Sequence, residues 1–478
     1  MNQPETASVI SSSAEVSSAE YFAQRQLKQG TVGWLLLIGL GVAYVISGDF
    51  AGWNFGIAQG GWGGMFIATA LAALMYLCLC LSMSEMSTMM PTAGGGYSFA
   101  RAAFGPFGGY LTGTAILIEY AIAPAAIAVF IGGYCESLFG INGWMIYLAC
   151  YAIFMGIHLK GAGEALKIMF AITLVAAVAL VVFIGAMIPH FNAQNLFDIP
   201  VSTGVGASLF LPHGYLGIWA AVPFAIWFFL AVEGVPLAAE EAKDPAKSLP
   251  RGLIGAMLIL TAFAMLILFL GAGAAGASTL QNSGAPLVDA LVKVYGTNTW
   301  LATFVNFVGL AGLIASFFSI IYAYSRQIFA LSRAGYLPTS LSLTNKNKAP
   351  YLAIIIPGII GFLLSLTKEG DSLILIAVFG ATISYVLILL SHIKLRLSKP
   401  DMPRPYQTPG GIITSSIALV LAVAAVVAGF VVNPKVWFIA AGIYVAFIAY
   451  FLFYSRYHLV KGTPEEEFAN IKAAEQEL

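Results

Sequence analysis

Three carboxylates lie inside long apolar stretches of the sequence, at Asp49, Glu119 and Glu233. Burying a charged aspartate in hydrocarbon costs at least about 2.5–3.5 kcal/mol, and no lysine or arginine lies at the same depth in these stretches to neutralise the acids. Each acid is therefore protonated, faces an aqueous cavity or meets a cation from outside. A set of acids without bases indicates a site for a cationic solute, a proton or a metal ion. The alternative is a protonated carboxyl group that only supports packing.

Two of these acids occur where a helix would be interrupted. Residues 47–54 read SGDFAGWN and residues 233–236 read EGVP. Glycine weakens a helix, and proline removes an amide donor and disrupts the turn before it. Two interruptions, each with an acid and five apolar stretches apart, are typical of an inverted five-plus-five repeat whose ligand binds at unwound segments near the membrane midplane.

Small and aromatic residues at the interruptions are further candidates for contact with a solute. Unwound helix would offer backbone groups, and ring faces attract ammonium groups, although core packing explains most of the aromatic residues. The predicted binding residues are Ser47, Gly48, Asp49, Trp53, Tyr120, Trp227, Phe228, Glu233 and Gly234. Asp49 would accept the cation, and Glu233 would be a second acceptor or a coupling site.

Coupling to an ion would need residues of its own. Glu119 could carry a proton. Ser316 and Ser319 could bind sodium, although serines in membrane helices more often bond their own backbone. No resident metal is expected, because the five histidines show no metal-ligand spacing, and no cofactor is expected.

The composition excludes a soluble protein. Charged residues make up 9% of the 478 residues, where about 25% is usual in soluble domains, and hydrophobic residues make up 59%. The net charge of zero gives no basic field for nucleic acid. No nucleophile–base pair or signalling domain is visible, which argues against a membrane enzyme or a receptor.

Twelve apolar stretches are candidate membrane spans, since a spanning helix needs roughly 20 apolar residues. Lipid leaves an unpaired backbone amide without a partner, and the runs lack period-two alternation, so helices are expected and a barrel is not. The stretches are about 33–58, 62–89, 107–134, 142–158, 167–189, 216–239, 252–274, 299–323, 351–366, 371–392, 412–431 and 435–455.

Basic residues orient these spans. With the N-terminus inside, all but Lys293, Lys368 and Lys435 of the 22 lysines and arginines fall on the inner side. Both termini are therefore expected in the cytoplasm, with the protein in the cell membrane.

The expected organisation is one transmembrane domain between two tails. Residues 1–30 are expected to be a disordered cytoplasmic tail, and residues 456–478 a second cytoplasmic tail. The domain would span 31–455. Within it, the two repeats would cover about 31–190 and 215–395, and two further helices would cover 412–455.

Four segments carry a resemblance to a known family. Residues 85–97 (EMSTMMPTAGGGY) with 104–106 (FGP) resemble the span 2–3 signature of the amino acid–polyamine–organocation (APC) transporters. Residues 240–251, 325–338 and 404–410 resemble later loops of that family, in the same order. The resemblance implies an all-α polytopic membrane protein with 12 transmembrane helices, a LeuT/APC-like five-plus-five inverted repeat and discontinuous helices 1 and 6.

Span 1 departs from the usual pattern of the family it resembles. The family has Gly-Ser-Gly-Ile, whose amides hold a substrate carboxylate, but residues 46–49 read ISGD. An acid there would repel a carboxylate and attract an ammonium group. Residues 47–56 (SGDFAGWNFG) resemble the ethanolamine permease subfamily. Some members of the family carry a span 5 lysine in place of a sodium ion, and none occurs between Ile168 and Pro189.

Three hypotheses follow. The first is a secondary transporter of ethanolamine or a similar small amine, with the bilayer and that amine as its partners. The second is a transporter or exchanger of cationic amino acids or polyamines. The third, more distant, is a membrane receptor or enzyme without transport. The sequence leaves the coupling ion open between H⁺ and Na⁺, and it leaves the oligomeric state open.

Overall fold

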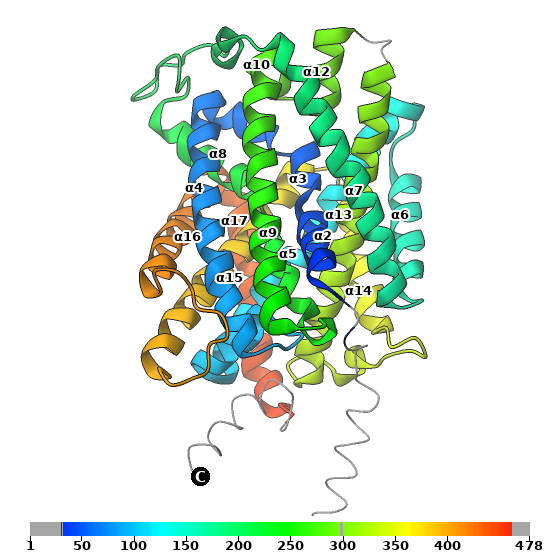
Figure 1. Ribbon diagram of the computed structural model, residues 1–478, viewed down its shortest axis with the longest axis vertical. Helices are drawn as coiled ribbons and strands as arrows, with labels where there is room; N and C mark the ends of the chain where they lie inside the picture. The colour runs from blue at the N-terminus through cyan, green and yellow to red at the C-terminus, as the bar shows by residue number, and fades with distance from the viewer. Residues whose placement is uncertain (1–29, 31, 297–299, 461–478) are drawn as a thin grey trace, which may run out of the picture.

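The computed structural model describes residue 30 and residues 32–296 and 300–460, with the side chains of 162–166 left out of the description. The described chain is a bundle of helices (Figure 1), and its β-type pairing is one isolated parallel bridge between Val32 and Ala242. The predicted disorder of residues 1–30 falls almost wholly outside the described residues. The same holds for most of the predicted C-terminal tail.

The longer helices follow the predicted apolar stretches, except α12, which lies between the stretches 252–274 and 299–323. They are α2 Trp34–Val45, α4 Asn54–Met89, α5 Gly96–Phe139, α6 Trp144–His158, α7 Ala162–Met187, α8 Gly214–Trp227, α9 Pro245–Leu266, α12 Pro286–Tyr295, α13 Trp300–Arg333, α14 Tyr351–Ser365, α15 Gly370–Ser398, α16 Ile412–Val432 and α17 Pro434–Phe453. The short elements are α3 Ser47–Phe50, η1 Ile188–His190, η2 Ala193–Phe197, η3 Val232–Glu241, η4 Ile267–Gly271, α10 Ala272–Ala275, α11 Ala277–Leu280, η5 Thr339–Ser342 and η6 Ser455–Tyr457.

Within the described residues, nine helices are long and apolar enough to cross a membrane. Three shorter apolar helices, α2, α6 and α14, occupy the remaining predicted stretches. Each predicted stretch thus contains an apolar helix, while the count of twelve spans and the inverted repeat stay predictions.

Helix α5 forms the centre of the bundle. In α5, 89% of the most apolar 18-residue stretch is buried. The corresponding share is 22% in the last apolar helix, which includes α17. In Figure 1, α16 and α6 stand at opposite edges, with α2, α3 and α5 between them. A Cβ at Gly380 of α15 would lie 2.5 Å from the carbonyl oxygen of Ala115 and 2.8 Å from the amide nitrogen of Glu119. Glycine therefore lets α15 lie directly against the backbone of α5 beside Glu119.

The predicted break in the first span is confirmed. Helix α2 ends at Val45, and the single turn α3 follows. Ala51 is then extended, and Gly52 adopts a φ of +97° before α4 begins. A positive φ of this size is natural only for glycine, so Gly52 lets the chain turn between the two helical halves.

The break in the sixth span lies earlier than predicted. The prediction placed it at residues 233–236, but α8 ends at Trp227 and the chain turns at Ala231, whose φ is +77°. Pro236 then lies inside the tighter 3-10 helix η3. Proline lacks an amide donor and disfavours an α-helical turn before it, in keeping with the 3-10 geometry of η3. The non-helical turn occupies residues 228–231, ahead of η3.

Candidate functional site

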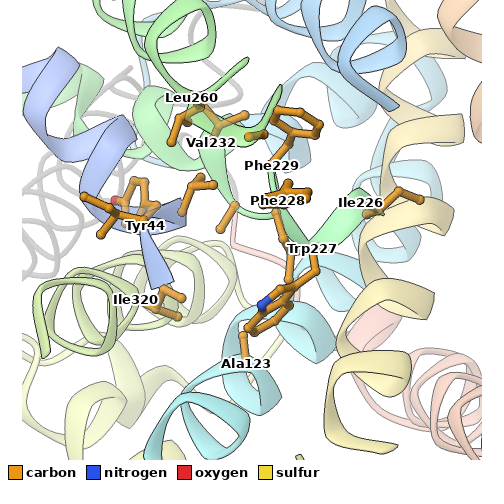
Figure 2. Close-up of a cluster of buried hydrophobic side chains, with 14 of the residues drawn as sticks. Tyr44, Ala123, Ile226, Trp227, Phe228, Phe229, Val232, Leu260 and Ile320 are labelled. Atoms are coloured by element: carbon orange, nitrogen blue, oxygen red, sulfur yellow. The ribbon is translucent and has the colours of Figure 1, made fainter. Parts of the chain in front are cut away.

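The two interrupted helices lie against each other (Figure 2). A Cβ at Gly48 would lie 2.6 Å from the carbonyl oxygen of Trp227. The indole Nε1 of Trp227 donates a hydrogen bond to the carbonyl oxygen of Ala51, at 2.9 Å. In Figure 2 the Trp227 ring lies toward Ala123 of α5, while Phe228 and Phe229 leave the same segment farther along. The backbone of one break is therefore held by the side chain that ends the other helix.

Asp49 is fully buried within this contact. It belongs to α3, its exposed fraction is 0%, and neither carboxylate oxygen has a hydrogen-bond partner within the described chain. No described charged side chain is close enough to influence it electrostatically. A buried carboxyl group normally has partners, so Asp49 offers two free acceptor atoms in α3, beside the break in span 1.

Serines of α13 meet the same segment. The Ser316 hydroxyl donates to the carbonyl oxygen of Tyr44 at 2.7 Å and lies 2.8 Å from the Ser47 hydroxyl. The Tyr44 carbonyl belongs to the last turn of α2, where carbonyls lack helical partners. Ser319 instead donates to the Ser316 carbonyl of its own helix, at 2.9 Å. Ser319 thus follows the alternative interpretation of bonding its own backbone, whereas Ser316 connects α13 to the broken helix.

Aromatic rings surround the breaks. Trp53 and Phe228 stack with centroids 5.7 Å apart and planes 20° apart. Phe130 of α5 meets Trp227 edge-on at 6.3 Å. The indole Nε1 of Trp53 is buried and has no hydrogen-bond partner among the described residues. The predicted aromatic residues Trp53, Trp227 and Phe228 therefore do gather at the junction of the two interruptions.

The three membrane acids do not form one group. Glu119 of α5 and Glu233 of η3 lie close enough to interact with each other, whereas Asp49 lies apart from both. The Tyr120 hydroxyl donates to Oε1 of Glu233 at 3.2 Å. Both oxygens of Glu119 and Oε2 of Glu233 lack hydrogen-bond partners in the described chain. The site is therefore divided into a lone aspartate and a pair of glutamates.

Two tyrosines beside the glutamate pair were not predicted. The hydroxyls of Tyr76 in α4 and Tyr385 in α15 lie 2.8 Å apart, and both rings are buried. Both tyrosines interact electrostatically with Glu119 and Glu233. A tyrosine in the middle of an apolar stretch needs a polar partner for its hydroxyl, so its presence in the sequence indicates a buried polar group nearby. The chain has 21 tyrosines, however, and only the fold distinguishes these two.

Comparison with known proteins assigns the family. Residues 32–453 match the family model described as amino acid permease. The chain belongs to the amino acid permease family. This permease is therefore a member of a transporter family within the APC superfamily and not an enzyme, and its apolar helices are those of a multi-pass membrane protein.

Relatives of the permease carry several substrate names. It is 27% identical to the branched-chain amino acid permease BcaP of Bacillus subtilis (strain 168) over 454 residues, which cover 89% of this chain and 92% of the relative. An uncharacterized transporter of Rhizobium meliloti (strain 1021) is 27% identical, covering 80% and 83%. The aromatic amino acid transport protein AroP of Escherichia coli O6:H1 is 25% identical, covering 79% and 84%.

Two ion pairs, one buried and one partly buried, hold the η3 end of the permease. Arg326 contacts Glu241 at 2.9 Å, and the Tyr322 hydroxyl donates to the same carboxylate at 2.8 Å. Arg333 contacts Glu240 at 2.7 Å. These pairs join the end of η3 to α13. The start of α2 joins them through two backbone hydrogen bonds, from the Val32 amide to the Glu241 carbonyl and from the Lys243 amide to the Val32 carbonyl.

Glu85 lies near the end of α4 and is fully buried. It accepts hydrogen bonds from Arg396 at 2.5 Å, from Arg404 at 3.0 Å and from the Thr408 amide at 2.7 Å. These donors come from the end of α15 and from the segment 399–411 that precedes α16. Glu85 therefore fixes that segment to α4.

Proposed function

We propose that this permease is a secondary active transporter of a small organic amine, most directly ethanolamine, which works by alternating access in the cell membrane with both termini in the cytoplasm. The observation that carries the proposal is Asp49, a fully buried carboxylate in α3, beside the break in span 1, whose two oxygens have no hydrogen-bond partner within the described chain. Its position is the one from which family members are expected to bind a substrate carboxylate.

The chemistry around Asp49 suits an ammonium group. A carboxylate forms its strongest hydrogen bonds with charged donors, and an ammonium group supplies three of them. The stacked rings of Trp53 and Phe228 supply faces that attract a cation. Ser47, Gly48 and Gly234 supply backbone groups beside the breaks. A solute with its own carboxylate would place two negative charges together in a buried site, which is unfavourable.

A polyamine or a cationic amino acid is the second candidate substrate. The observation that favours a polyamine is the division of the acids into two places, the lone Asp49 and the pair of Glu119 and Glu233. A diamine has a cationic group at each end and could use both. The branched-chain and aromatic amino acids named for the relatives are the substrates that Asp49 disfavours.

The test is uptake of labelled ethanolamine into proteoliposomes of the full chain, with excess choline, putrescine, lysine and leucine as competitors. We expect saturable uptake that small amines block and leucine does not. Block by putrescine or lysine, with no ethanolamine uptake, would support the second candidate. Leucine uptake that ethanolamine leaves unchanged would reject the amine proposal.

Substitution of Asp49 tests its role. Asp49→Asn keeps the shape and removes the charge, so it loses a charge-assisted hydrogen bond of about 1.5–3 kcal/mol. This loss corresponds to a roughly 10- to 150-fold lower affinity for ethanolamine. The matched control is Asp371→Asn, at an exposed aspartate in the first turn of α15. Unchanged ethanolamine affinity in a folded Asp49→Asn protein would remove Asp49 from the site.

A further inference from the structure

The glutamate pair has chemistry of its own, separate from Asp49. We propose that Glu119 and Glu233 together bind one proton, shared between their carboxyl groups, and that this proton couples transport to a proton gradient. The proposal deepens the proposed transport function and rests on it. It gives Glu233 a role in coupling, which the sequence had left open against a role as a second amine acceptor.

Burial and proximity determine how many protons the pair can bind, since the hydroxyl of Tyr120, the residue next to Glu119, lies 3.2 Å from Oε1 of Glu233. The two side chains are 0% and 2% exposed and come from different elements, α5 and η3. Two carboxylates that share a buried site do not both ionise, because their like charges repel and neither is solvated. Neither oxygen of Glu119 has a described hydrogen-bond partner, and Oε2 of Glu233 has none either. Free acceptor atoms on both groups leave a place for one O–H between them.

An independent polar group points to the same place. The Tyr44 hydroxyl is buried and has no hydrogen-bond partner in the described chain. Tyr44 interacts electrostatically with Glu233 and with Tyr120. A Cβ at Gly234 would lie 3.0 Å from the Tyr44 ring and 3.1 Å from the Tyr120 hydroxyl. Gly234 thus lets two phenols from different helices approach the pair.

The groups that interact with the pair are neutral acids or hydroxyls from four helices. They are Tyr120 from α5, Tyr44 from α2, Tyr76 and Cys80 from α4, and Tyr385 from α15. The described cation that interacts with Tyr44 is Arg326, which is already paired with Glu241. Phenol hydroxyls donate hydrogen bonds to carboxylates, so they stabilise the remaining single charge of the pair. Among the described residues, no group of three or more histidines, cysteines, aspartates or glutamates is arranged to hold a metal ion.

The position of the pair explains how one proton can couple to movement. Glu233 lies in η3, beyond the break, whereas Glu119 lies in the continuous helix α5. Rocking of the broken helices would separate the two carboxyl groups, and a shared proton binds less well to separated groups. The proton would form an O–H bond on entering from the outer solution, and the same bond would break on release to the cytoplasm.

The experiment uses proteoliposomes of the full chain with a pH-sensitive dye in the lumen. We expect ethanolamine uptake by the unmodified protein to acidify the lumen. Glu119→Gln should lose gradient-driven accumulation at least about tenfold, since it removes one half of the pair. It should keep ethanolamine–ethanolamine exchange, which needs no net proton movement, within about twofold. The control Glu369→Gln changes an exposed glutamate outside the bundle core and should change neither quantity.

The outcomes separate this inference from the proposed function. Ethanolamine uptake without acidification would overturn the inference and leave the function intact. Leucine uptake in place of ethanolamine, with acidification that Glu119→Gln abolishes, would reject the amine substrate and support the inference. Leucine uptake without acidification would overturn both.

A second variant covers the case in which Glu119→Gln does not fold, as judged by size-exclusion chromatography. Tyr385→Phe keeps both carboxyl groups and removes a neighbouring hydroxyl donor. Loss of a donor disfavours the ionised form, so the pH profile of uptake should shift toward higher pH with the maximal rate retained. An unchanged pH profile in a folded Tyr385→Phe protein would overturn the inference.

Discussion

At Gly48 and Gly52, the missing side chain allows two interrupted helices to touch. A Cβ at either position would lie 2.6 Å from an atom of Trp227, the backbone oxygen in the first case and Nε1 in the second. A contact with backbone cannot be relieved by a rotamer change. Close packing of the two breaks therefore depends on Gly48 and Gly52, which have no side chain.

Gly48→Ala should destabilise the permease by about 1–3 kcal/mol, the usual cost of overpacking a tight core. Its Tm in detergent, measured by thermal unfolding, should fall. The matched control is Gly442→Ala in α17, where a Cβ would meet nothing within 4 Å. An unchanged Tm for Gly48→Ala would show that the two breaks can separate at no cost.

At the scale of elements, the end of η3 is held in place by side chains of α13. Glu241 and Arg326 are 1% and 4% exposed, so each depends on the other for compensation of its charge. Removing one partner of a buried pair is strongly destabilising, by about 3–5 kcal/mol, because the remaining charge is left alone. The pair therefore connects the stability of η3 to that of α13.

A double-mutant cycle measures this connection. Glu241→Gln and Arg326→Gln should each lower stability by about 3–5 kcal/mol, while the double variant should cost much less than their sum. The readout is thermal unfolding of all four proteins. Lys247→Gln is the control, since its pair with Asp244 is exposed at 72% and 51% and should contribute no more than about 1 kcal/mol. Additive effects at Glu241 and Arg326 would contradict the coupling.

At the scale of the molecule, α16 and α17 lie at the periphery and depend on Glu85 for one attachment. The most apolar 18-residue stretches of these two helices are 33% and 22% buried. The segment 399–411 before α16 is fixed by the hydrogen bonds that Glu85 accepts from Arg396, Arg404 and Thr408. One carboxylate thus joins the two last helices to the central bundle.

Glu85→Gln should free this segment, because a neutral amide cannot balance two guanidinium groups. Hydrogen–deuterium exchange across residues 399–411 should become at least about tenfold faster, with exchange in α5 unchanged. Glu136→Gln, at an exposed glutamate, is the control and should leave the segment protected. Equal protection in the Glu85→Gln protein would show that the loop is held by its other contacts.

The sequence predicts features that depend on local chemistry. Apolar length located the helices, and the glycine-rich residues 47–54 located the first break correctly. The second break was placed at residues 233–236 because proline and glycine stand there, yet the chain turns at residues 228–231, which contain neither. The pairing of Glu119 with Glu233 and of Tyr76 with Tyr385 joins residues more than 100 positions apart. Only packing of α4, α5, η3 and α15 brings them together, so no local pattern could reveal it.

The parallel bridge between Val32 and Ala242 has a consequence for how this permease can evolve. Its two hydrogen bonds use only backbone amides and carbonyls, at 2.9 Å each. Nearly any side chain could replace Val32 or Lys243 without removing them, and only proline would delete a donor. The start of the first helix and the end of η3 would therefore stay tied together in descendants whose residues at these positions had drifted beyond recognition. An alignment would show variable residues at positions where the backbone hydrogen bonds are retained.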